Sequence, residues 1–81
     1  MSRELVSPAD RSSIIHAVKV NGIWRGTRQH VRIELQITQQ PDLNGNRLLW
    51  RASHRRRRYS GQAVNVFDAL QTIAARIKEA R

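Results

Sequence analysis

Residues 30–38, His-Val-Arg-Ile-Glu-Leu-Gln-Ile-Thr, alternate strictly between polar and apolar side chains. In a β-strand every second side chain lies on the same face, so this pattern separates an apolar row from a polar row. We therefore expect a half-buried antiparallel strand with its polar row in solvent. The apolar row, expected to face the core, consists of Val31, Ile33, Leu35 and Ile37.

The C-terminal segment, residues 65–81, repeats apolar side chains every three or four positions, which is typical of an amphipathic helix. Asn65 is a suitable N-cap, and Asp68 would lie near the positive end of the helix dipole. We expect this helix to cover one face of the sheet and to leave the other face open. Its apolar stripe consists of Phe67, Leu70, Ile73, Ala74 and Ile77.

Residues 14–20, Ile-Ile-His-Ala-Val-Lys-Val, are rich in β-branched side chains and predict another strand. Asn21 and Gly22 then predict a tight turn. Gly26 interrupts the following residues, which form either a short hairpin or one long strand with a bulge. The sequence leaves these two alternatives open.

Residues 47–60 predict a third strand, with Leu48, Trp50 and Ala52 facing the core. It runs into four consecutive arginines, Arg55–Arg58. A strand of twelve residues spans about 40 Å, whereas a helix of 14 residues covers only about 21 Å. We therefore expect the burial of alternate side chains to cease near His54. Arg56 and Arg58 would follow His54 on the inward-facing side, and the protruding end would be basic on both faces.

The chain is therefore predicted to be an α+β domain with a three-stranded antiparallel sheet packed on one C-terminal helix. A short fourth strand is an open alternative. This β-β-β-α domain would occupy residues 13–81. Residues 1–12 would form a flexible arm or a short helical turn, since Ser7 could cap a helix and Pro8 suits its first position.

The charge of the chain gives the strongest indication of function. Fifteen Lys and Arg side chains stand against six Asp and Glu, and the net charge is +9. Thirteen of the fifteen are arginines, and residues 12–58 hold ten basic against two acidic side chains. Arginine is suited to bidentate contact with phosphates and base edges. We therefore predict nucleic-acid binding, with duplex DNA favoured over RNA and an accessory or regulatory role.

The binding surface would be the open face of the sheet together with the arginine run, because a sheet bearing Arg, Gln and Ser can enter a DNA groove. Gln36 and Ser53 would lie among its cations. The basic candidates are Lys19, Arg25, Arg28, Arg32, Arg51, Arg55, Arg56, Arg57 and Arg58. An alternative is an interaction or inhibitor protein whose basic face or edge docks on an acidic protein. A second copy is a further candidate partner, because so short a chain has a thin core.

Several other classes are disfavoured. The chain has no cysteine, which excludes disulfides and thiolate zinc sites. His16, His30 and His54 lack metal-ligand spacing, and the acidic residues form no evident general acid/base pair. We expect no enzymatic activity, cofactor or metal. No apolar run is long enough to span a membrane, so a cytoplasmic or nucleoid-associated protein is expected. Trp50 is predicted in the core, while Trp24 suits either the core or base stacking.

Parts of the sequence resemble the DNA-binding domain of plant ethylene-response factors and the arm-binding domains of phage integrases. The four stretches that carry the resemblance are Trp24–Gln29, Ile33–Ile37, Arg47–Trp50 and Val66–Leu70. The resemblance spans about residues 24–77. It implies a three-stranded sheet that reads the major groove, with Arg25, Arg28, Arg32 and Arg51 approaching DNA. A double-stranded-RNA-binding domain is disfavoured, because it begins with a long helix that residues 1–13 would not supply. Its last helix also has a basic start, whereas residues 65–68 here are Asn-Val-Phe-Asp.

Overall fold

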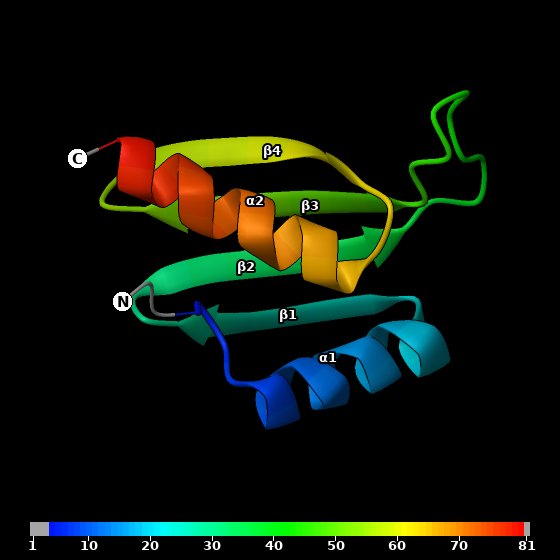
Figure 1. The fold of residues 1–81 in the computed structure, drawn as a ribbon, viewed down its shortest axis with the longest axis horizontal. Helices are drawn as coiled ribbons and strands as arrows, with labels where there is room; N and C mark the ends of the chain where they lie inside the picture. Colours follow the sequence, from blue (N-terminus) through cyan, green and yellow to red (C-terminus); the bar gives the residue numbers. More distant parts are fainter. Residues whose placement is uncertain (1–3, 81) are drawn as a thin grey trace.

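The computed structural model describes residues 4–80, which form two helices and four strands (Figure 1). The strands form an antiparallel sheet in the order β1-β2-β3-β4. The α+β class, the antiparallel sheet and the C-terminal helix are confirmed. The sheet has four strands, the number that the sequence left open beside three, and the prediction of a single helix is wrong. The elements are α1 (Pro8–Asn21), β1 (Ile23–Arg28), β2 (Val31–Ile37), β3 (Leu48–His54), β4 (Arg57–Ala63) and α2 (Val66–Glu79).

The strand predicted at residues 14–20 is instead the second half of α1. Ser7 caps this helix, because its Oγ accepts a hydrogen bond from the Asp10 amide at 3.1 Å. Ile14 and Val18, one turn apart, are buried on the same side of the helix, and this burial outweighs their preference for strands. Gly22 ends the helix with a φ of 78°. Helix α1 supplies the N-terminal helix that residues 1–13 were not expected to form, but α2 begins without basic side chains, so only one of the two differences from a double-stranded-RNA-binding domain is removed.

The strand predicted over residues 47–60 is two strands joined by a tight turn. Arg55 and Arg56 form this turn, with φ values of 51° and 68°, and His54 pairs with Arg57 across it. Both turn residues have left-handed conformations, as in the type I′ turns of two-residue hairpins. The turn resets the alternation, so the predicted inward row through Arg56 and Arg58 is wrong, and Arg58 belongs to the open face.

The core lies between the sheet and the helices. The predicted core positions of β3 are confirmed, and Trp50 is only 2% exposed. Two predicted core residues are not buried: Ile37 ends β2 and Phe67 lies at the start of α2, each 42% exposed. The Arg11 guanidinium lies 4.8 Å from the centroid of the Phe67 ring. The core includes Ile14, Val18, Val31, Ile33, Leu35, Leu48, Trp50, Ala52, Ala69, Leu70 and Ile73.

Glycines make room for both tryptophans on this side of the sheet. A Cβ on Gly61, which lies opposite Trp50, would be 2.6 Å from Trp50 Cζ2. A Cβ on Gly26 would be 2.5 Å from Trp24 Cζ2. Gly26 does not interrupt the strand, because it pairs with Ile33 inside a continuous β1. The hairpin that follows turns at residues 29 and 30, later than either alternative considered from the sequence.

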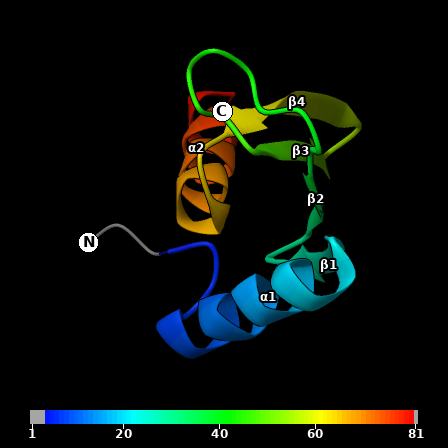
Figure 2. The same cartoon turned by 90° about the vertical axis from the view of Figure 1, so that its right-hand side faces the viewer.

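The helices leave one face of the sheet uncovered. Helix α2 packs on β3 and β4, while α1 lies along β1 at the edge of the sheet (Figures 1 and 2). The buried side chains of both helices join the same core. Within residues 4–80, no helix covers the opposite face, whose side chains are mostly exposed. We call this surface the open face.

Candidate nucleic-acid interface

The strand register arranges the open face in three rows that run across the four strands. The row nearest the two hairpin turns, the turn row, consists of Thr27, Arg32, Ser53 and Arg58. The middle row consists of Arg25, Glu34, Arg51 and Ser60. The far row consists of Ile23, Gln36, Leu49 and Gln62.

Each strand contributes one arginine to the open face. The four alternate between the middle row and the turn row, so each is a diagonal neighbour of the next, at about 7–8 Å. The outer strands are about 14 Å apart, because neighbouring strands are separated by about 4.8 Å. All four arginines are exposed. We call this set the arginine zigzag; it consists of Arg25, Arg32, Arg51 and Arg58.

Glu34 is the one acidic side chain in the three rows of the described sheet. Its Oε1 accepts a hydrogen bond from Arg25 Nε at 3.3 Å, and its side chain is 24% exposed. Glu34 also lies opposite Arg51. The middle row is therefore partly neutralised, the turn row is purely cationic, and the far row is uncharged. Positive charge increases along the strands toward the hairpin turns.

Arg55 and Arg56 extend this positive charge beyond the turn row. Both are exposed at the tip of the β3–β4 hairpin. A left-handed conformation is unfavourable for a residue with a Cβ, and turns of this kind favour Asn and Gly. Such strain often occurs at functional sites, so these two arginines are candidates for contact with a ligand.

A shallow hollow of about 810 Å³ lies over the turn and middle rows. All four arginines of the zigzag line it, together with Ser53, Ser60 and the acidic Glu34. The hollow can therefore offer guanidinium and hydroxyl donors to one anionic group or to a chain of them.

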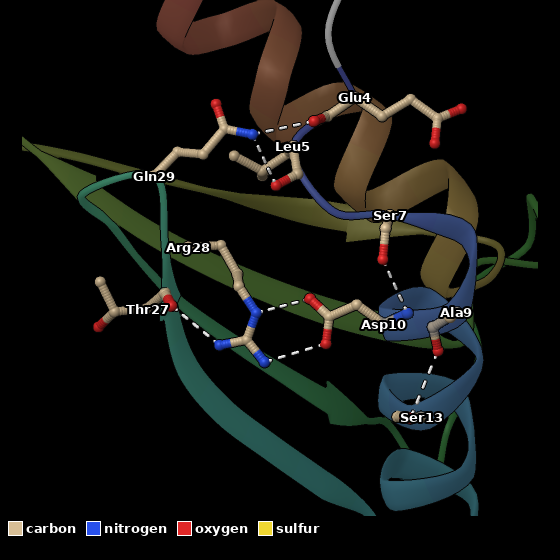
Figure 3. A network of polar contacts seen from close by, with 9 residues as sticks. All are labelled: Glu4, Leu5, Ser7, Ala9, Asp10, Ser13, Thr27, Arg28 and Gln29. Atoms are coloured by element: carbon tan, nitrogen blue, oxygen red, sulfur yellow. Dashed lines mark hydrogen bonds and ion pairs between the residues drawn. The ribbon is translucent and has the colours of Figure 1, made fainter.

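Arg28 lies on the side of β1 opposite the zigzag and holds α1 against the sheet (Figure 3). Its Nε and Nη2 donate to the two carboxylate oxygens of Asp10, at 2.6 and 3.1 Å. This bidentate contact lowers the pKa of Asp10 below its ordinary value of 3.8. The Arg28 guanidinium also lies 5.2 Å from the centroid of the Trp24 ring. Arg28 is therefore not part of the open face.

Two further candidates also lie off the open face. Lys19 is exposed on α1, and Arg57 pairs with His54 on the helix-bearing side of the sheet. The open face instead includes Thr27, Ser60 and Gln62, and Arg25 lies on it rather than in a turn beside it. Ser60 and Gln62 were not predicted there, because they belong to β4. Their alternation after the arginine run was the signal that could have revealed this strand.

All four aromatic side chains lie away from the open face. Trp50 is buried, as predicted, while Trp24 and Tyr59 are half-buried against the core. Phe67 is on α2. Of the two alternatives for Trp24, packing against the core and base stacking, the structure shows the first.

Within residues 4–80, no group of three or more His, Asp or Glu side chains is placed to hold a metal ion. Neither described helix is long and apolar enough to cross a membrane. No protein-family model, curated protein or solved structure matches the chain.

Proposed function

We propose that this chain is a non-enzymatic nucleic-acid-binding module that contacts phosphates through the arginine zigzag and the Arg55–Arg56 turn. The observation that carries the proposal is the concentration of arginines on one face. Each of the four strands places one exposed arginine there, and two more lie in the adjoining turn. In ethylene-response-factor domains a sheet likewise contacts DNA.

The unliganded protein gains little from this arrangement. Like charges at neighbouring positions of a sheet repel one another, and Glu34 offsets only part of the charge. A phosphate backbone would remove the repulsion and would release its condensed counterions into solution. The arrangement thus favours an extended polyanion over a small neutral ligand.

A titration with nucleic acid tests the proposal. Random-sequence duplex DNA, single-stranded DNA and RNA would each be added at low salt in a gel-shift assay. Amide chemical shifts would then be followed with the ligand that binds. We expect a shift with at least one nucleic acid and perturbed amides in the turn and middle rows. Binding to none of the three, or perturbations confined to α2, would contradict the proposal.

A second candidate, docking on an acidic protein, is supported by the outer edge of β4. The two-residue turn makes His54 and Arg57 a hydrogen-bonded pair, so the backbone N–H and C=O groups of Arg58, Ser60 and Gln62 point away from β3. α1 lies along β1 at the other edge of the sheet, whereas none of the described elements pairs with this edge of β4. An extended acidic peptide could add there as a fifth strand.

Gln62→Pro distinguishes the two candidates, because it removes an edge N–H and leaves the arginines and the serine hydroxyls of the hollow in place. Unchanged gel shifts in this variant would support binding through the open face. No shift of the wild-type protein with any nucleic acid would favour the acidic protein partner.

A further inference from the structure

We propose that the nucleic acid is a duplex that lies across the four strands over the turn row and is held by its phosphates without readout of its bases. This inference rests on the proposed function and specifies the ligand of the same site. It follows from which side chains the open face carries, from the direction in which charge changes along it, and from its width and shape.

The open face lacks the side chains that hold single strands. Proteins that bind single-stranded nucleic acid stack bases on aromatic side chains. The aromatic residues Trp24, Trp50 and Tyr59 all pack against the core, and Phe67 is on α2. The described open face offers Arg, Ser, Thr and Gln instead. These groups hydrogen-bond to phosphates and leave a single strand without an aromatic stacking partner.

The direction of the duplex follows from the charge of the three rows. A backbone that ran along the strands would pass over the uncharged far row. A backbone that runs across them over the turn row would stay near Arg32 and Arg58, with the Arg55–Arg56 turn on one side and Arg51 on the other. Glu34 in the middle row would repel phosphates, and this favours backbone contact on the turn side of that row.

The length of the zigzag suits this direction. One strand of a DNA duplex has one phosphate per about 3.4 Å of helix axis. The roughly 14 Å between the outer strands therefore spans several successive phosphates of a duplex. The zigzag distributes its four arginines over this length.

The width and shape of the open face argue against readout in a groove. The major groove is about 12 Å wide and admits an α-helix or a two-stranded ribbon. The four strand axes alone span about 14 Å, before side chains are added. A shallow hollow also lies over the turn and middle rows. A hollow lined with arginines fits the convex phosphate backbone, so binding should be independent of sequence, unlike that of the ethylene-response-factor domain.

The test compares ligands of equal length by fluorescence anisotropy. Labelled 16-mers would include three unrelated DNA duplexes, one RNA duplex and the separated DNA strands, at one low salt concentration. We expect the three DNA duplexes to bind within about threefold of one another, well below the roughly 1,000-fold or larger gap between specific and non-specific sites. At least one kind of duplex, DNA or RNA, should bind about tenfold more tightly than the single strands, which have a lower charge density.

Two variants with equal numbers of substitutions test the direction of the duplex. Arg32→Ala with Arg58→Ala removes the cations of the turn row, and we expect it to weaken duplex binding strongly. Gln36→Ala with Gln62→Ala changes the far row, and we expect affinity within about twofold of wild type.

Three results would overturn the inference while leaving the proposed function standing. They are single strands binding as tightly as duplexes, one duplex sequence binding 100-fold more tightly than the others, and equal losses in the two double variants. Absence of binding to every oligonucleotide would overturn both the inference and the proposed function.

Discussion

The two faces of the sheet share the same four strands and differ in almost every side chain. The covered face carries Leu35 and Trp50 in the core and a glycine opposite the indole ring. The open face carries an exposed arginine on each strand. Because side chains alternate between the faces, a substitution can alter one face without entering the other. Stability and ligand binding should therefore be separable, residue by residue.

The two hairpin turns show the same division. Residues 29 and 30 have φ values of 52° and 66°, close to those of the Arg55–Arg56 turn. The side-chain Nε2 of Gln29 donates hydrogen bonds to the carbonyl oxygens of Glu4 and Leu5, at 2.9 and 3.0 Å (Figure 3). Within residues 4–80 no ion pair or side-chain hydrogen bond engages Arg55 or Arg56. The first turn stabilises the fold, whereas the second displays charge.

Replacing three arginines of the open face should have the largest effect on binding. The triple variant Arg32→Ala, Arg51→Ala and Arg58→Ala loses three charge-assisted contacts, and we expect duplex affinity to fall about 100-fold. Its free energy of unfolding should stay within about 0.5 kcal/mol of wild type or increase, because the substituted side chains are exposed. Anisotropy and thermal unfolding measure the two quantities. The control, Lys19→Ala with Arg76→Ala and Lys78→Ala, removes equal charge from the two helices, and an equal loss there would contradict the division between faces.

Gly61→Ala should have the largest effect on stability. Its Cβ would clash with the buried ring of Trp50, and we expect a loss of about 2 kcal/mol, or about 8–16 °C in melting temperature. Gly26→Ala meets Trp24 at a similar distance, but that ring is half-buried on an edge strand and can shift. The loss for Gly26→Ala should therefore be smaller. An equal or greater loss at Gly26 would show that the covered face is not organised around Trp50.

The turn variant Arg55→Asn with Arg56→Gly should change stability and binding in opposite directions. Asn-Gly adopts the left-handed conformations of this turn with less strain, so we expect about 1 kcal/mol of added stability. Loss of two phosphate contacts should lower duplex affinity about tenfold. Thermal unfolding and anisotropy on the same preparation test both effects. Increased stability with unchanged affinity would remove these arginines from the site.

Asp10→Asn should have the smallest effect, and only on stability. The pair with Arg28 is partly exposed, so we expect a loss of about 0.5–1 kcal/mol at neutral pH. The pKa of Asp10 is lowered in the folded protein, so its stabilisation is present above the ordinary value of 3.8 and decreases as the pH falls below it. The difference between wild type and variant in urea unfolding should therefore shrink between pH 5 and pH 3. A pH-independent difference, or weakened duplex binding, would contradict a purely structural role for this pair.

The sequence predicted those elements whose periodicity agrees with their burial, such as β2, the first half of β3 and α2. It misled at residues 14–20, where β-branched side chains favour a strand, although the cap at Ser7 and the i, i+4 spacing of Ile14 and Val18 indicated a helix. The β3–β4 turn could not be read from the sequence, because Arg55 and Arg56 carry none of the usual Gly, Asn or Pro signals. Both errors changed the predicted membership of the open face. Arg32 and Arg51 lie on it as predicted, whereas Lys19 and Arg57 do not.

The dependence of duplex affinity on salt concentration tests the central claim most directly. Six arginines, four in the zigzag and two in the turn, would give a slope of log affinity against log salt near about −5. The triple variant of the open face should reduce the slope to about −3, and Asp10→Asn should leave it at about −5. A wild-type slope near zero, or equal slopes for the wild type and the triple variant, would contradict the assignment of phosphate binding to the open face.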